Sequence, residues 1–343
     1  MNLADLNTVA QAMVVSGKGI LAADESSPTI TKRFDAIGVT STEESRRDYR
    51  EMMFRATDAM TKCISGVILY DETIWQNARD GTPLVKLIEQ AGAIPGIKVD
   101  EGTQPLSGCP GELVTVGLDR LAERLKKYYA QGARFAKWRA VIDINAAGRI
   151  PSMTAIGVNA HALARYAALC QAAQIVPIVE PEVLMDGDHD IERCFEVTTR
   201  VLNVTFQELR KQRVALEGMI LKPNMAISGK KCAKKASVEE VAEKTLRMLK
   251  ACVPAAVPGI AFLSGGQSDE EATAHLNAMN GMANLPWKLT FSYGRALQAA
   301  PQKVWSGKAE NVAAGQRALN HRARMNSLAS KGEWKADLEK KVA

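Results

Sequence analysis

The sequence predicts an α/β protein of the (β/α)8 or TIM barrel class with a helical C-terminal tail. Short apolar runs rich in β-branched residues recur along the chain, and the segments between them have apolar residues every three or four positions. About eight such runs start roughly 30 to 50 residues apart, which fits a barrel with some long loops. A doubly wound open sheet is the alternative, but its first turn usually carries GxGxxG, and no such motif follows GILAAD.

The individual elements follow from the same patterns. Helical periodicity is clearest at 41–60 and 237–253, and the chain from about 310 to 343 has the pattern of a helix followed by a charged tail. Capping boxes, in which a serine and a glutamate three residues later satisfy free N–H groups, predict three helix starts. The boxes are Ser41 with Glu44, Ser237 with Glu240, and Ser268 with Glu271. The expected strands are 19–24, 66–72, 94–100, 133–139, 175–182, 218–223, 259–266 and 289–295.

The composition predicts one globular domain over residues 1–343. The chain is 46% hydrophobic and 24% charged, and no linker, repeat or low-complexity tract divides it. Its first residues have neither a secretory nor a convincing transit pattern. No apolar run approaches the roughly 20 residues that span a bilayer, so we expect no membrane association.

Charge and cysteine content narrow the possible partners. A net charge of +6 is compatible with an ordinary basic surface or with a site for an anionic small molecule. Nucleic acid binding would need clustered Lys and Arg with interleaved aromatics, whereas the chain is 5% aromatic and its densest basic cluster is the short KKCAKK, 230–235. The 6 cysteines form no CxxC pair, which argues against a zinc cage or a disulfide framework and favours a reducing cytoplasm.

Nearly every expected strand ends in polar or ionisable residues. In a parallel barrel the carboxyl ends of all strands meet at one mouth, so these residues become neighbours there. Residues two apart share one face of a strand, and Lys137 with Arg139 and Glu180 with Glu182 therefore project together. Any one pair could be a strand cap or a structural ion pair, but the repetition indicates a site. The other strand-end residues are Asp24, Lys98, Lys222, Ser264 and the segment from Ser292 to Arg295.

Lys222 is the candidate nucleophile of this site. A free lysine has a pKa of about 10.4 and is protonated at neutral pH, but desolvation and a second cation both favour the neutral amine. Lys137 would supply that second cation if it faces the same mouth. A neutral amine there can condense with a ketone or aldehyde to form a Schiff base, which acts as an electron sink. A lone strand-end lysine is more often in a salt bridge, but Asp24, Glu180 and Lys137 favour the catalytic interpretation.

Two glycine-containing turns predict a phosphate site. LSGGQSDEEA places Ser264, Gly265 and Gly266 between a strand and a helix start, and SYGRA places Gly294 and Arg295 after the next strand. Backbone N–H groups at such turns bind phosphate, and the seventh and eighth loops are the usual place in this barrel. Gly-Gly alone usually marks only a tight turn, and the nearby arginine strengthens the phosphate interpretation.

Two other motifs are discounted. DGDHD, 186–190, lacks the spacing of a calcium loop, and its aspartates are expected to be solvated or to cap the following helix. The 4 histidines form no HxxxH or similar cluster, so we expect no metal. Ser264 lies in LSGGQ rather than in the GxSxG elbow of a hydrolase nucleophile.

Taken together, seven motifs resemble those of class I fructose-1,6-bisphosphate aldolases, from about residue 10 to about residue 330. They are GKGILAADES, GIKVDEG, FAKWRAV, VPIVEPE, EGMILKPNM, FLSGGQS and TFSYGRALQ. The resemblance implies a cytoplasmic lyase of glycolysis and gluconeogenesis that reversibly cleaves fructose-1,6-bisphosphate to dihydroxyacetone phosphate and glyceraldehyde-3-phosphate. It also implies a lysine Schiff base, no metal or other cofactor, a sugar phosphate as the substrate, and a homotetramer.

The resemblance further implies roles for individual residues. Lys222 would form the Schiff base, and Glu180, with Glu182 nearby, would be the general acid/base for forming and dehydrating the carbinolamine. Asp24 would accept the hydroxyl proton during carbon–carbon cleavage, and Lys137 would stabilise developing negative charge. One phosphate would meet Ser264, Gly265, Gly266, Ser292, Gly294 and Arg295, and the other would meet Ser26, Thr29, Arg33, Lys98 and Arg139.

The chain departs from the family pattern at two places. Thr29 stands where serine is common and Pro28 replaces a glycine, which keeps the hydroxyl but should stiffen the loop. Many eukaryotic members end in a flexible tail whose final tyrosine assists proton exchange on the enamine, whereas this chain ends in EKKVA and its last tyrosine is Tyr293. We therefore predict that another group or water transfers that proton, and that removing the final ten residues changes turnover little.

Two alternatives remain open at this point. One is a Schiff base aldolase for another phosphorylated ketose, since the sequence does not reveal the preference between one-phosphate and two-phosphate sugars. The other is a non-catalytic scaffold that binds an anionic partner through 230–235 and a basic barrel mouth. The presence of Lys222, Asp24 and Glu180 argues against this scaffold.

Overall fold

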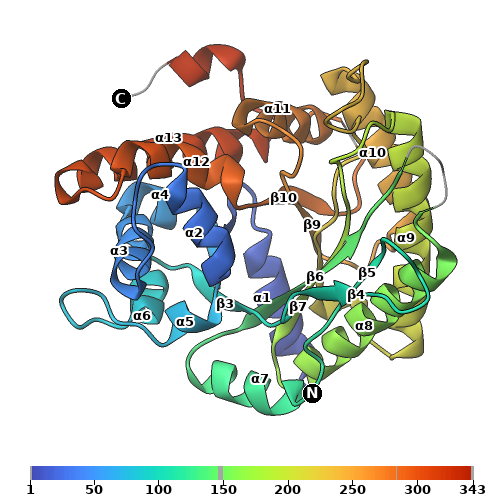
Figure 1. The fold of residues 1–343 in the computed structure, drawn as a ribbon, viewed down its shortest axis with the longest axis horizontal. Helices are drawn as coiled ribbons and strands as arrows, with labels where there is room; N and C mark the ends of the chain where they lie inside the picture. The colour runs from blue at the N-terminus through green and yellow to red at the C-terminus, as the bar shows by residue number, and fades with distance from the viewer. Residues whose placement is uncertain (1, 146–149, 283, 341–343) are drawn as a thin grey trace.

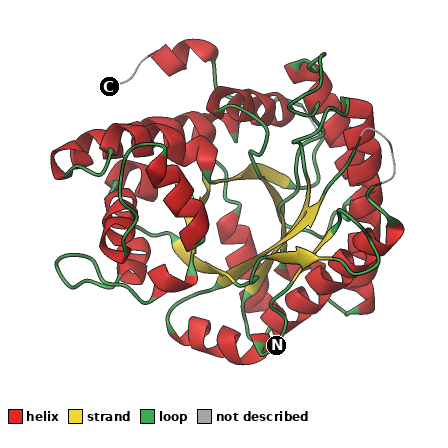
Figure 2. Ribbon diagram, viewed as in Figure 1, coloured by secondary structure: helices red, strands yellow, loops and turns green. Residues whose placement is uncertain are grey.

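Eight parallel strands form a closed barrel surrounded by helices, which confirms the predicted fold class (Figures 1 and 2). The structure is a computed structural model and describes residues 2–145, 150–282 and 284–340. Around the barrel the strands follow the order β1-β10-β9-β8-β7-β6-β3-β2. The barrel strands are β1 (Gly19–Ala23), β2 (Ile64–Leu69), β3 (Ile94–Lys98), β6 (Phe135–Ile142), β7 (Val176–Val183), β8 (Ile220–Leu221), β9 (Gly259–Phe262) and β10 (Lys288–Tyr293).

All eight expected strands are present, and their lengths differ from the prediction. β8 has only two residues, whereas β6 continues to Ile142 and pairs along its whole length with β7. A feature that the sequence did not indicate is a small antiparallel hairpin between β3 and β6, formed by β4 (Thr103–Pro105) and β5 (Leu113–Thr115). This hairpin lies outside the barrel sheet.

Helices occupy the segments between the barrel strands and form the outer layer in Figure 2. The α-helices are α1 (Leu3–Met13), α2 (Ser27–Asp35), α3 (Glu43–Phe54), α4 (Thr57–Lys62), α5 (Asp71–Ile74), α6 (Leu84–Gln90), α7 (Leu121–Ala130), α8 (Met153–Ala172), α9 (Ile191–Lys211), α10 (Val238–Cys252), α11 (Asp269–Asn280), α12 (Arg295–Trp305) and α13 (Val312–Ala329). Three short 3-10 helices are η1 (Leu216–Gly218), η2 (Ala309–Asn311) and η3 (Ala336–Lys340). No helix in the described part of the chain is long and apolar enough to cross a membrane.

The capping prediction for α3 is wrong by one residue. The helix is capped by Thr42, whose side chain accepts from the Ser45 N–H while the Ser45 side chain accepts from the Thr42 N–H, so Ser41 and Glu44 form no box. The Ser41 hydroxyl instead accepts a hydrogen bond of 2.8 Å from Thr31, a contact with α2 that local sequence does not reveal. The other two boxes are confirmed at the starts of α10 and α11.

The amino end of the barrel is closed by α1. Leu6 and Met13 are fully buried in one apolar cluster with interior residues of the strands, and the Ser65 hydroxyl at the start of β2 donates to the Met13 carbonyl oxygen. Phe135 fills the barrel beside β3, where a Cβ on Gly96 would lie 2.2 Å from its ring. This apolar plug leaves the carboxyl end of the barrel as the place for a polar site.

Candidate active site

A cavity of about 700 Å³ opens at the carboxyl ends of the barrel strands. The structure brings together there every predicted site residue except Gly266, which is not among the lining residues. The predicted residues that line it are Asp24, Ser26, Thr29, Arg33, Lys98, Lys137, Arg139, Glu180, Glu182, Lys222, Ser264, Gly265, Ser292, Gly294 and Arg295.

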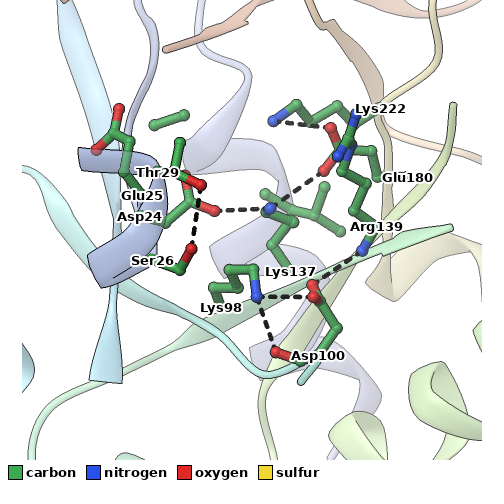
Figure 3. Close-up of polar contacts among 12 residues, drawn as sticks. Asp24, Glu25, Ser26, Thr29, Lys98, Asp100, Lys137, Arg139, Glu180 and Lys222 are labelled. Carbon is green, nitrogen blue, oxygen red and sulfur yellow. Dashed lines mark hydrogen bonds and ion pairs between the residues drawn. The ribbon is translucent and has the colours of Figure 1, made fainter. Parts of the chain in front are cut away.

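Four charged side chains form a continuous chain of ion pairs across this cavity (Figure 3). The amine of Lys137 lies 2.6 Å from Asp24 Oδ2 and 3.5 Å from Glu180 Oε2. The other oxygen of Glu180, Oε1, lies 3.3 Å from the amine of Lys222. The side chains of Lys137, Glu180 and Lys222 are each at most 5% exposed. Glu180 thus links the two lysines and is the only carboxylate in ion-pair contact with Lys222 among the described residues.

The charges of these four side chains determine the pKa values of Asp24 and Lys137. Burial by itself would raise the pKa of Asp24, but Lys137, Lys222 and Lys98 outweigh it and lower the pKa to about 2. Burial would lower the pKa of Lys137, but Asp24, Glu180 and Asp100 together raise it above its ordinary value. Lys137 is therefore a permanent cation in the cavity, as expected, and carboxylates lie on both sides of it.

The strand-face predictions are also confirmed. Lys137 and Arg139 both point into the cavity from β6, and Glu180 and Glu182 both point into it from β7. Arg139 and Glu182 form a close ion pair, and the Glu182 side chain is 7% exposed. Burial would lower the pKa of Arg139, but Glu182, its main partner, raises it. Glu182 is therefore held by an arginine on the neighbouring strand.

On one side of the cavity each basic residue has a carboxylate partner. The Lys98 amine lies 2.7 Å from Asp100 Oδ1, and the other oxygen of Asp100 accepts from the Arg139 backbone N–H at 3.2 Å (Figure 3). Arg33 Nη1 lies 2.5 Å from Glu25 Oε1. An anion that binds on this side must therefore compete with carboxylates of the protein for the same cations.

The opposite side, formed after β9 and β10, is arranged differently. Gly265 and Gly294 line the cavity there beside Arg295, which donates to the Gln267 carbonyl oxygen at 2.7 Å and has no carboxylate partner among the described residues. The Ser292 hydroxyl is buried without a hydrogen-bond partner in that same part of the chain. A cation without a carboxylate partner and a hydroxyl without a hydrogen-bond partner are well placed to bind an anionic group.

Asp100 and Glu25 line the cavity but were missed in the sequence. Asp100 lies two residues after Lys98 and so shares its face, a signal that could have identified it. Glu25 follows Asp24 beyond the end of β1, where the alternation of strand faces no longer applies. Its Oε1 accepts from Gln298 at 2.8 Å, a contact with α12 that no local pattern predicts.

No group of three or more His, Cys, Asp or Glu side chains suited to a metal ion occurs within residues 2–145, 150–282 and 284–340. In the DGDHD segment Asp190 caps α9 by accepting from the Arg193 N–H, which confirms the capping interpretation. The six cysteines are all free.

The cavity thus combines a buried amine, carboxylates on both sides of a permanent cation, and basic groups at both ends. A carboxylate in contact with an amine can take its proton and so make it a nucleophile toward a carbonyl carbon. The same carboxylate can later protonate a leaving hydroxyl. Basic groups at two ends suit a substrate with an anionic group at each end.

Comparison with known proteins agrees with this chemistry. Residues 5–343 match the family model described as fructose-bisphosphate aldolase class-I. A probable fructose-bisphosphate aldolase class 1 of Xanthomonas campestris is 58% identical over 336 residues, covering 98% of this chain and 100% of that protein. Fructose-bisphosphate aldolase B of Gallus gallus is 52% identical over 330 residues, with 96% and 90% covered. A solved structure of the Plasmodium falciparum fructose-bisphosphate aldolase superposes with a TM-score of 0.95 at 49% identity, covering 97% of this chain and 96% of that one.

Proposed function

Because this chain belongs to the class I fructose-bisphosphate aldolase family, we propose that Lys222 is the amine through which it cleaves fructose-1,6-bisphosphate reversibly in glycolysis and gluconeogenesis. The observation that carries this assignment is the chain of contacts from Asp24 through Lys137 and Glu180 to Lys222. The Lys222 amine lies 3.3 Å from Glu180 Oε1, a carboxylate that can accept its proton and later return it, whereas Lys137 is held between Asp24 and Glu180.

The reaction begins at Lys222. Its proton passes to Glu180, and the neutral amine attacks the ketone carbon of the open-chain sugar to give a carbinolamine. Glu180 then protonates the carbinolamine hydroxyl, which leaves as water, and an iminium remains on Lys222. The products of this stage are one water and one covalent, positively charged enzyme–substrate adduct.

Cleavage follows at the bond between the third and fourth carbons. Asp24 accepts the proton of the hydroxyl on the fourth carbon, the bond electrons move to the iminium nitrogen, and glyceraldehyde-3-phosphate leaves with an enamine remaining. The positive charge on Lys222 is one of the charges that hold the pKa of Asp24 near 2. As the iminium becomes a neutral enamine that charge disappears, so Asp24 becomes a stronger base during the step that needs one. Protonation of the enamine carbon and hydrolysis of the imine then release dihydroxyacetone phosphate.

The two ends of the cavity position the phosphates in this proposal. Ser264, Gly265, Gly266, Ser292, Gly294 and Arg295 hold one, with the cavity-lining members in direct contact and Gly266 shaping the turn. Ser26, Thr29, Arg33, Lys98 and Arg139 hold the other. The hydroxyls of Ser26 and Thr29 already share a hydrogen bond of 3.1 Å. Basic groups at both ends favour a two-phosphate sugar over a one-phosphate sugar.

Reductive trapping tests the assignment. Borohydride added with dihydroxyacetone phosphate should fix the ligand covalently on the peptide that contains Lys222, as read by peptide mass mapping. Lys222→Met should abolish both trapping and cleavage. Labelling of another lysine would refute the role of Lys222, and a preference for fructose-1-phosphate over the bisphosphate would favour the alternative of another ketose.

The whole chain, 1–343, is proposed to act as one barrel domain that assembles into a homotetramer in the cytoplasm. Six free cysteines fit a reducing compartment, and a cytosolic fructose-bisphosphate aldolase of Arabidopsis thaliana is 54% identical over 322 residues. Light scattering of the purified protein tests the tetramer, and a monomeric mass at micromolar concentration would contradict it.

A further inference from the structure

Another cavity, of about 550 Å³, lies between α4 and α13. Cys63 in its lining comes directly before β2, so this cavity is at the amino end of the barrel, whereas the active-site cavity opens at the carboxyl end. Figure 1 shows α4 beside α13 on the outside of the barrel. The proposed reaction uses no residue of this cavity.

One face of α13 gives the cavity its basic character. Arg317, His321 and Arg324 all line it and are spaced by four and three residues, which places them on one face of the helix. Seven residues of helix rise by about 10 Å, so the bases of the two arginine side chains are separated by about that distance along the axis. A ligand with two or more anionic groups can bind both arginines with their side chains apart, whereas a single compact anion must draw the two guanidinium groups together.

The charge of these residues is only partly compensated within the protein. Lys62 Nζ lies 2.6 Å from Asp58, the only acidic residue in the lining, and His321 lies 3.1 Å from Glu339. Arg317 and Arg324 have no ion pair or side-chain hydrogen bond within the described ranges. Guanidinium groups without a partner bind phosphate in a bidentate manner.

The cavity lining also contains uncharged groups, among them the Cys63 thiol and the Ser327 hydroxyl. Cys63 is 6% exposed and lies against the Ser327 hydroxyl, and burial raises the pKa of its thiol although Ser327, Lys18, Lys62 and Arg324 act in the opposite direction. The thiol therefore stays uncharged at neutral pH and does not compete with an outside anion for the arginines.

We propose that the cavity between α4 and α13 binds a small molecule that carries two or more phosphate groups, at a site separate from the active site. Its volume lies within the range of small-molecule sites, roughly 300 to 1,000 Å³. The two arginines without partners supply the charge, and their spacing along α13 favours a ligand with more than one phosphate. The occupant is bound and not transformed, because the cavity holds no nucleophile paired with a base.

Titration calorimetry with tripolyphosphate tests the proposal. The active-site cavity is first saturated with a hexitol 1,6-bisphosphate, which has no carbonyl to react. We expect one further tripolyphosphate per chain, and a loss of affinity of at least tenfold in Arg317→Ala/Arg324→Ala. A matched control, Lys303→Ala/Lys308→Ala, removes the same charge from exposed residues that do not line the cavity and should bind like the parent protein.

Several results would overturn the proposal. One such result is that no tripolyphosphate binds once the active-site cavity is saturated. Another is an equal loss of affinity in the two double variants, which would indicate only general charge attraction. If an oligoglutamate peptide displaced tripolyphosphate at a concentration lower than that of the tripolyphosphate, the cavity would be assigned to an acidic protein segment instead. Orthophosphate should bind at least tenfold more weakly than tripolyphosphate, and equal affinity would remove the argument from spacing. Unchanged cleavage activity in both double variants verifies that they are folded.

Discussion

Deleting the last ten residues, 334–343, separates a role of the tail in stability from a role in turnover. The tail contacts the rest of the protein through Glu339, which is bound to α13, and through Trp334, which packs on the core and donates its backbone N–H to Asn277 at 2.9 Å. Glu339 Oε2 accepts from Arg322 Nη1 at 2.5 Å and from His321 at 3.1 Å, and its Oε1 accepts from Trp334 at 3.0 Å. The side chains of Arg322 and Glu339 are 5% and 9% exposed, so deletion leaves a nearly buried guanidinium without its counter-charge.

The size of the effect follows from that loss. Removing one partner of a buried ion pair costs about 3 to 5 kcal/mol. The entropy of unfolding is about 2.1 cal/mol/K per residue, or roughly 0.7 kcal/mol/K for 343 residues. The thermal midpoint should therefore fall by about 4 to 7 °C. Arg322 keeps its hydrogen bonds to the Asp269 carbonyl oxygen and the Thr273 hydroxyl, so the start of α11 next to the active site stays in place.

Differential scanning calorimetry and a coupled cleavage assay measure the two quantities on the same samples. We expect kcat within about twofold of the parent protein together with the lower midpoint. Glu339→Gln should reproduce most of the destabilisation, and Asp337→Asn, which changes an exposed carboxylate of the same segment, should not. A large loss of kcat with an unchanged midpoint would refute the reasoning and place the tail in the chemistry.

Three further changes test the site and the fold. The pKa of Asp24 is lowered from 3.8 to about 2, so its charge contributes about 2 kcal/mol to the free energy of unfolding. This contribution is complete above about pH 4 and is lost as the pH falls through 2. Asp24→Asn should therefore remove this part of the acid-unfolding profile measured by circular dichroism, and an unchanged profile would contradict the lowered pKa. Arg295→Ala should raise KM for fructose-1,6-bisphosphate by about tenfold or more, with a smaller change in kcat, because Arg295 has no competing carboxylate in the described structure. Initial-rate measurements that show an unchanged KM would exclude Arg295 from phosphate binding. Ser237→Ala removes the confirmed cap of α10 and should cost about 1 kcal/mol in chemical unfolding without a change in kcat; loss of activity at full stability would be unexpected.

The sequence predicted most of the residues that line the cavity, because two simple rules determine where they lie. Parallel strands bring their carboxyl ends together, and alternate residues of a strand share a face. Lys137 with Arg139 and Glu180 with Glu182 could therefore be assigned to one mouth of the barrel from their spacing alone. Asp24 and Lys222 follow directly after their strands and were found by the same rule.

What the sequence did not predict depends on contacts between distant segments. The hairpin of β4 and β5 has three-residue strands, and β4 is fully exposed, so it lacks the alternation of apolar residues that marks a strand. Ser41 and Thr42 are equally good caps by type, and only the contact of Ser41 with Thr31 on α2 decides between them. The choice of Glu25 as a partner for Arg33 likewise depends on how α2 lies over the end of β1.

The structure also changes the explanation for how Lys222 would become a nucleophile in the proposed reaction. The sequence suggested that repulsion from Lys137 makes the amine neutral, but Glu180 lies between the two lysines and attracts both. Asp24, Lys137, Glu180 and Lys222 together carry two positive and two negative charges. Transfer of a proton from Lys222 to Glu180 leaves their sum at zero before and after the step, so a neutral amine forms without leaving a net charge in a buried site, which would otherwise cost several kcal/mol. Glu180 is then protonated and within reach of the carbinolamine oxygen, so the transfer that prepares the nucleophile also prepares the acid for dehydration.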